Sequence, residues 1–145
     1  MFAGARLYWR LFKPMSLGVK VMLIRDDQTL LVKHSYKPGW YFPGGVIKKK
    51  ESVETAARRE AREEVGATLG PLELFGIYSN LQGPTSDHIT VLVCKEFELN
   101  GRSDAEIAEA RFFPLDNLPD DTADGTRRRI EAYCNGRHQP DIGDW

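Results

Sequence analysis

An acidic, arginine-rich stretch, ARREAREEVG at residues 57–66, constrains the fold more than any other part of the chain. If this stretch is helical, Glu60, Glu63 and Glu64 share one face, because residues three and four apart are neighbours on a helix. Like charges at these spacings cost roughly 0.2–0.5 kcal/mol per pair. Three arginines on the same segment offset part of that cost: Arg58, Arg59 and Arg62. A solvated face does not need this arrangement, but a divalent cation does, so we expect a metal site here.

The chain as a whole indicates one domain behind a short leading segment. Its 145 residues are enough for one hydrophobic core, and no internal repeat, low-complexity tract or break in composition marks a second domain. We assign residues 1–16 to the leading segment, which could form an amphipathic helix, and residues 17–145 to the domain. Basic residues interrupt the apolar ones near the N-terminus, so no signal peptide is expected. Membrane contact through residues 1–15 is not expected either.

Charge and cysteine usage limit the partners of this protein. The formal net charge of −1 and the pI of about 6.3 argue against stable nucleic-acid binding, so an anionic substrate must be handled locally by a metal or a few basic side chains. Cys94 lies in an apolar run and Cys134 near the end of an expected helix, and no CxxC spacing occurs. We expect no disulfide between them and a cytoplasmic location. The sequence leaves a homodimer open.

The hydrophobic pattern predicts an α/β fold in which a mixed β-sheet is sandwiched between helices. Residues 17–25 and 29–35 are typical of two strands paired as a hairpin around the turn DDQ. Further extended segments are expected over residues 41–47, 72–80, 87–99 and 109–115. A second helix is expected over residues 123–135, and the tail from 136 to 145 is expected to be irregular.

The clearest predicted element is a helix over residues 52–65. Ser52 or the residue before it caps the start, and Gly66 ends the helix. The face opposite the glutamates repeats every four residues and is mostly small: Val53, Ala57, Ala61 and Val65. Such a face suits close packing on a sheet. One side of the helix is therefore expected in the core and the other side is acidic.

Residues 45–67, GVIKKKESVETAARREAREEVGA, resemble the Nudix box, G-x5-E-x7-R-E-U-x-E-E-x-G-U, where U is a bulky aliphatic residue. All seven invariant letters are present. With each letter at roughly 7% abundance, a chance match in one chain is on the order of one in a million. Both U positions are alanine, Ala61 and Ala67, which bears on helix packing more than on chemistry. The run Lys48–Lys50 could help to bind a polyphosphate, although a solvated loop explains it equally well.

The resemblance to MutT-like Nudix hydrolases implies the Nudix fold and a metal-dependent hydrolase. Such an enzyme cleaves the pyrophosphate linkage of a nucleoside diphosphate joined to another moiety, X. The resemblance implies that Glu60, Glu63 and Glu64 hold Mg²⁺, with Mn²⁺ as the alternative, and that the Gly44 carbonyl is a further ligand. Chemistry agrees, because hydrolysis of a diphosphate needs its oxygens neutralised and a water activated, and a divalent ion does both.

Other residues take supporting roles by the same resemblance. Arg59 would hold a glutamate in orientation, and Glu51 would brace the loop through Arg59. The general base stays open between Glu60 and two carboxylates further along the chain. These are Glu106, placed where MutT-like members carry a loop glutamate, and its rival Glu109.

Five residues are expected to touch the substrate: Gly44, Gly45, Phe42, His34 and His88. The stretch GWYFPGG offers three rings, Trp40, Tyr41 and Phe42, that could stack on a base, although core packing should account for at least one. The stretch DHIT resembles a strand start in MutT-like proteins, where His88 could contact a phosphate or base. The box determines the chemistry of the reaction but does not identify the moiety X. The absence of an extra N-terminal domain, common in ADP-ribose pyrophosphatases, favours a compact enzyme acting on a nucleotide.

The competing interpretation is a Nudix-fold module that binds a nucleotide without hydrolysing it. Such modules usually lose one or more of the glutamates of the box. This chain keeps Glu51, Glu60, Glu63 and Glu64, so an active pyrophosphohydrolase is the favoured function.

Overall fold

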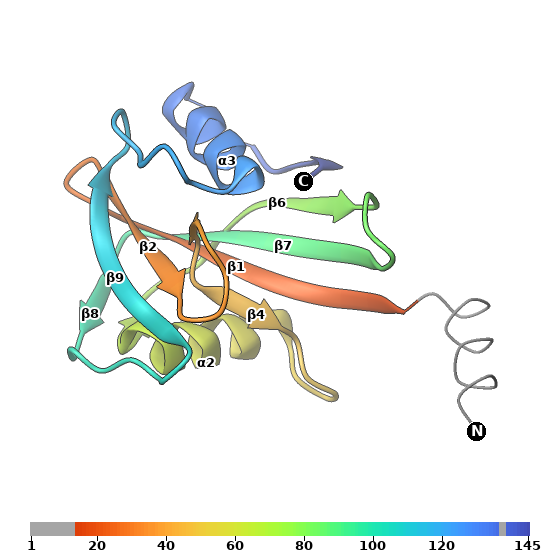
Figure 1. Cartoon of the computed structure of the whole chain (residues 1–145), viewed down its shortest axis with the longest axis horizontal. Coiled ribbons are helices and arrows are strands. Elements are labelled where there is room, and N and C mark those ends of the chain that lie inside the picture. The colour runs from red at the N-terminus through yellow and green to blue at the C-terminus, as the bar shows by residue number, and fades with distance from the viewer. Residues whose placement is uncertain (1–13, 137–138) are drawn as a thin grey trace.

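The computed structural model describes residues 14–136 and 139–145, and shows a mixed sheet between two helices (Figure 1). The helices are α2 (Val53–Val65) below the sheet and α3 (Asp124–Cys134) above it. The strands are β1 (Met15–Arg25), β2 (Gln28–His34), β3 (Trp40–Tyr41), β4 (Gly44–Val46), β5 (Ala67–Leu69), β6 (Glu73–Asn80), β7 (Ser86–Cys94), β8 (Phe97–Leu99), β9 (Ile107–Pro114) and β10 (Asp141–Asp144). The predicted α/β architecture is confirmed.

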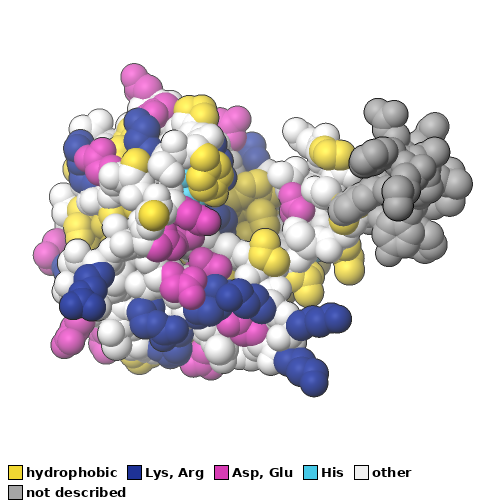
Figure 2. Space-filling model, turned by 60° about the horizontal axis from the view of Figure 1, so that its bottom comes forward, with side chains coloured by type: hydrophobic (Ala, Val, Ile, Leu, Met, Phe, Trp, Pro, Cys, Tyr) yellow, Lys and Arg dark blue, Asp and Glu magenta, His cyan; other side chains and the backbone are white. Residues whose placement is uncertain are grey.

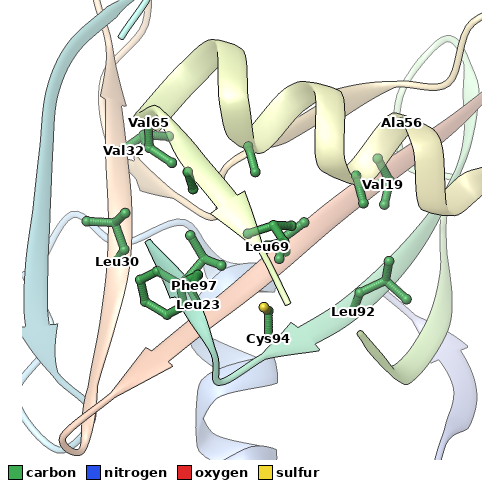
Figure 3. Close-up of a cluster of buried hydrophobic side chains, with 14 of the residues drawn as sticks. Val19, Leu23, Leu30, Val32, Ala56, Val65, Leu69, Leu92, Cys94 and Phe97 are labelled. Carbon is green, nitrogen blue, oxygen red and sulfur yellow. The ribbon is translucent and has the colours of Figure 1, made fainter. Parts of the chain in front are cut away.

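Strand β1 forms the centre of the eight-stranded sheet, whose order is β10-β6-β7-β1-β2-β3, with β4 paired to β1 and β9 to β2. It runs parallel to β7 and antiparallel to β2, which confirms the predicted hairpin. Val19, Val21 and Leu23 face α2, whereas Met22 and Ile24 face α3, so the strand is buried on both sides. Figure 3 shows the cluster on the α2 side.

Helix α2 begins and ends where the sequence predicts. The Ser52 side chain accepts a hydrogen bond from the Thr55 backbone N–H at 3.0 Å, and Gly66 follows the helix in the left-handed conformation with φ 65°. Ala57 and Ala61 are fully buried against the sheet. Their small side chains let the helix backbone approach the strands closely, which brings its acidic edge next to β4.

The predicted irregular tail is wrong over its last residues, because Asp141–Asp144 forms strand β10, parallel to β6. Side chains from distant parts of the chain hold it there. The Tyr78 hydroxyl donates to the Asp141 carboxylate at 2.6 Å, and the Arg129 guanidinium donates to the Asp144 carbonyl at 3.1 Å. The same guanidinium lies 3.8 Å from the centroid of the Tyr78 ring, an attractive cation–π distance.

Three other segments differ from the prediction. The single strand expected over residues 87–99 is broken after Cys94, and its end, β8, pairs with β5 in a separate two-stranded sheet. The sequence did not indicate β5. The last predicted strand, at 109–115, begins two residues earlier, at Ile107.

The expectations for the N-terminus, the cysteines and membrane contact can be compared only with the described residues. The predicted leading segment, residues 1–16, lies outside them except for its last three residues. Cys94 is buried, Cys134 is exposed, and both are free. Within the described ranges, no helix has the length and apolar character needed to cross a membrane.

The contact between α3 and the C-terminal residue gives a test of the fold. A Cβ on Gly125 would overlap the ring of Trp145, whereas a Cβ on Gly143 would meet nothing within 4 Å. We expect Gly125→Ala to lower the free energy of unfolding by about 1–3 kcal/mol, as overpacking does. This loss should outweigh the helix propensity of alanine, which favours the variant by at most about 1 kcal/mol. Urea unfolding would measure it. Gly143→Ala is the control, and equal stability of the two variants would contradict the packing.

Candidate active site

Two glycines let strand β4 lie close to strand β1 and to the acidic helix. Gly45 pairs with Val19 of β1, and a Cβ placed on Gly45 would lie 2.5 Å from Oε1 of Glu60. Gly44 has φ 153°, and a Cβ there would overlap the Val19 carbonyl oxygen. Gly44 therefore needs glycine, whereas a side chain on Gly45 would require the Glu60 carboxylate to move. The Gly44 backbone N–H donates to Oε2 of Glu64 at 3.3 Å, which joins the strand to the helix.

The three predicted glutamates lie at different depths. The Glu64 residue is 5% exposed, and the Glu60 side chain is 14% exposed. The Glu63 side chain is 44% exposed and reaches solvent. The predicted acidic face is thus graded from a buried carboxylate to a solvated one, and Figure 2 shows acidic and basic side chains side by side on the face below the sheet.

Arg59 binds three carboxylates at once. Its Nε and Nη2 donate to the two Glu51 oxygens at 2.7 and 2.8 Å, a bidentate pair. Its Nη1 donates to Glu60 at 2.8 Å and to Glu63 at 3.3 Å. Nη2 also reaches the Val46 carbonyl at 3.1 Å. The contacts expected of Arg59 with Glu51 and with a glutamate of the helix are therefore present, and they tie the loop before α2 to the acidic face.

These surroundings shift the pKa values in opposite directions. Burial raises the pKa of Glu64 to about 8, assisted by the charge of Glu60 and opposed by Lys20 and the Gly44 N–H. The bonds from Arg59 lower the pKa of Glu51 to about 2. The same pairing raises the pKa of Arg59, which stays charged.

Two residues near the carboxylates had no signal in the sequence that would single them out. Lys20 pairs with Gly44 across β1 and β4, and Glu64 is the charged group that acts on it most strongly. Asp104 donates its backbone N–H to the Glu63 carbonyl at 2.9 Å, and its charge acts on Glu64 and His34. Only the strand pairing and the loop before β9 bring these residues to the site.

His34 lies at the end of β2, beside the site. It is 8% exposed, and neither ring nitrogen has a hydrogen-bond partner in the described structure. Its ring centroid is 5.1 Å from that of Tyr36 and 5.5 Å from that of Tyr41. Burial, with the positive charges of Lys37 and Lys20, lowers the pKa of His34 to about 4, so the ring is neutral at pH 7.

The remaining predicted site residues are Phe42, His88, Glu106 and Glu109. Phe42 is fully buried in the core on the α3 side, so its ring has no face open to a ligand. His88 lies on β7, where its Nδ1 is 3.0 Å from the Ser79 hydroxyl. Glu109 pairs with Arg111. Glu106 is exposed; burial, with the charge of Glu106, raises the pKa of Tyr36.

The donor set of the site suits a hard divalent ion in chemical type, since carboxylates and backbone carbonyls are the ligands that Mg²⁺ and Mn²⁺ prefer. No three carboxylate, imidazole or thiol groups converge as a ready metal site in the part of the chain that the structure describes. Arg59 engages oxygens of both Glu60 and Glu63. To join Glu64 around one ion, these side chains would have to turn from Arg59.

Comparisons with known proteins agree with this geometry. The model of the NUDIX domain family matches residues 15–134. An ADP-ribose pyrophosphatase of Methanocaldococcus jannaschii is 31% identical over 116 residues, which cover 77% of this chain and 69% of that protein. A MutT-like protein of Streptomyces ambofaciens is 30% identical over 137 residues, which cover 85% and 86% of the two chains.

Solved structures give the same result. A MutT NUDIX hydrolase from Burkholderia pseudomallei has a TM-score of 0.73 at 27% identity, over 81% of this chain and 96% of that one. A NUDIX hydrolase from Nitrosomonas europaea has a TM-score of 0.74 at 25% identity, over 88% and 93% of the chains. The Nudix fold expected from the box is confirmed. Because the family matches most of the chain and three of the four glutamates of its box lie around one arginine, this protein belongs to the NUDIX hydrolases, which cleave a nucleoside diphosphate linked to another moiety.

Proposed function

We propose that this protein is a Mg²⁺-dependent pyrophosphohydrolase that acts on a small nucleoside diphosphate derivative in the cytoplasm. One observation supports it above the others: Glu64 is buried against the Gly44 N–H while Glu60 and Glu63 share Arg59 a turn away. A carboxylate at that depth, among further carboxylates, favours a bound cation.

The carboxylates and Arg59 have separate roles in this proposal. Glu60, Glu63 and Glu64 hold the divalent ion, and the Gly44 carbonyl is a further ligand. The ion would neutralise the phosphate oxygens and polarise the attacking water. Arg59 positions Glu60 and Glu63, and Glu51 holds Arg59 in place.

The proton acceptor is assigned to Glu60 or Glu106. Glu60 is close to the Gly45 backbone, and Glu106 lies on the loop that precedes β9. Glu109 is the weaker candidate because it is paired with Arg111. Replacing each in turn by glutamine and recording the pH dependence of kcat would separate them, since loss of the base removes the acidic limb of the profile.

The catalytic unit is proposed to be residues 17–145, without membrane contact through residues 1–15. Removing residues 1–13 and measuring activity and liposome binding would test both statements. A homodimer stays a prediction, and sedimentation of the full chain would test it.

A substrate panel tests the proposed function directly. Nucleoside triphosphates, oxidised nucleotides, nucleotide sugars, ADP-ribose and dinucleoside polyphosphates would each be incubated with Mg²⁺, and phosphate and pyrophosphate release would be measured. We expect one class to stand above the rest, activity to disappear with a chelator, and Mg²⁺ to restore it. Tight nucleotide binding without turnover would instead support the non-catalytic module.

Glu64→Gln should abolish most turnover and leave the fold intact. Glutamine keeps an oxygen for the Gly44 N–H but loses the charge that a divalent ion needs. We expect kcat to fall by more than the roughly 10- to 100-fold lost when only a ligand's supporting partner is removed. Glu54→Gln, an exposed change on the same helix, is the control. Full activity of Glu64→Gln, or a lost circular dichroism spectrum, would count against the assignment.

The Arg59–Glu51 pair also predicts a pH dependence of stability. The pKa of Glu51 falls from its ordinary 4.5 to about 2 on folding, so its stabilising contribution is complete above about pH 4.5 and disappears as the pH drops towards 2. Glu51→Gln should therefore lose less stability across that window than the wild type, as measured by urea unfolding at each pH. In an Arg59→Met background the effect of Glu51→Gln should shrink to the part that the Lys48 N–H bond contributes, and an undiminished effect would exclude Arg59 as the main cause.

A further inference from the structure

Lys20 is a cation built into the carboxylate site. Its pairing with Gly44 across β1 and β4 sets its backbone directly beside the strand that contacts Glu64. A Cβ placed on Gly44 would lie 2.9 Å from the Lys20 Cδ, so the lysine stem runs along the glycine. The side chain is half-buried; burial lowers the pKa of Lys20, and the charges of Glu64 and Glu60 oppose this shift.

In the described structure, Lys20 is the charged group that acts most strongly on Glu64. A buried carboxylate needs a nearby positive charge or hydrogen bonds, and the Gly44 N–H supplies one bond at 3.3 Å. A divalent ion on Glu64 takes over the neutralising role. The Lys20 ammonium is then beside a second cation, and an anion between the two relieves their repulsion.

A second lysine lies on the same side of the site. The Lys37 ammonium is 4.1 Å from the centroid of the Tyr41 ring, and both Lys37 and Lys20 act on His34. His34 keeps two unpartnered ring nitrogens in the described structure, and it is more than nine-tenths buried. Lys20 therefore lies within electrostatic reach of a second ammonium group, a neutral imidazole and the carboxylates of Glu60 and Glu64.

We propose that Lys20 binds a phosphate oxygen of the substrate, and that it exchanges Glu64 for this oxygen when the metal binds. This inference rests on the proposed function and deepens it. A ligand that fits this arrangement has two linked phosphate groups. One lies beside the metal held by the carboxylates, and the next lies beside Lys20. A monophosphate reaches only one of these positions, so Lys20 favours diphosphates over monophosphates.

The first measurement uses metal alone. Calorimetric titration of Mn²⁺ into the full chain without substrate should give several-fold tighter binding for Lys20→Met than for the wild type, because a competing cation is gone. Lys33→Met is the matched control, since the Lys33 ammonium pairs with Asp121 at 3.8 Å and lies over the Trp40 ring. Weaker Mn²⁺ binding by Lys20→Met would overturn the proposal, because Lys20 would then support the metal ligands rather than compete with the metal.

The second measurement uses methylenediphosphonate, a diphosphate analogue that cannot be hydrolysed, in saturating Mn²⁺. Lys20→Met should bind it roughly 10- to 100-fold more weakly than the wild type, the range for a lost charged hydrogen bond. The affinity for inorganic phosphate should fall less on the same substitution. Lys20→Arg should recover most of the diphosphonate binding, which a purely structural role would not require. Equal affinity of Lys20→Met and the wild type for the analogue overturns the proposal.

These tests separate this inference from the proposed function. A wild type that hydrolyses nothing in the panel, yet loses diphosphonate binding on Lys20→Met, disproves the hydrolase and retains the Lys20 site. Turnover in the panel, together with equal diphosphonate binding by Lys20→Met and the wild type, supports the hydrolase and disproves the Lys20 site. Circular dichroism checks the fold of each variant, and Lys20→Gln replaces Lys20→Met as the neutral variant if the methionine chain does not fold.

Discussion

The bonds of the Arg59 guanidinium are the interaction on which the site depends. Carboxylates three and four residues apart on one helix repel one another, and Arg59 places a positive charge between Glu60 and Glu63. The same group reaches the loop through Glu51 and strand β4 through the Val46 carbonyl. Helix, loop and strand thus meet at one planar cation, whose fixed fork of donors suits several acceptors at once.

A second cation works at the buried end of the same carboxylates. Arg59 engages the partly exposed glutamates, whereas Lys20 acts on Glu64, where burial raises the pKa. The two differ chemically: Arg59 is locked by a bidentate pair, while the lysine ammonium is a point charge on a flexible stem. In the proposed enzyme, a divalent ion would take oxygens from Arg59 and take over the role of Lys20 beside Glu64. The proposal therefore gives Arg59 and Lys20 one role without the ion and another with it.

The sequence predicts the local elements well because their signals are local. Ser52 and Gly66 mark the ends of α2, and the turn DDQ marks the β1–β2 hairpin. Strand β10 was missed because its four residues are exposed and carry no apolar alternation. It is held by Tyr78 and Arg129, which are far away in the sequence. The break after Cys94 was missed for a similar reason, since a continuous β-rich run gives no sign that its end pairs with a different sheet.

The sequence by itself determined the family, the acidic helix and the residues of the box, because fixed spacing on a helix decides which carboxylates share a face. Only the tertiary structure decided how these carboxylates differ. Packing buries Glu64 and leaves Glu63 in solvent, and the pairing of β1 with β4 brings Lys20 beside Gly44. It also removes Phe42 from the surface and buries His34, whose ring nitrogens have no hydrogen-bond partner among the described residues. Depth and strand register arise from contacts between residues distant in the chain, and helical spacing carries no information about them.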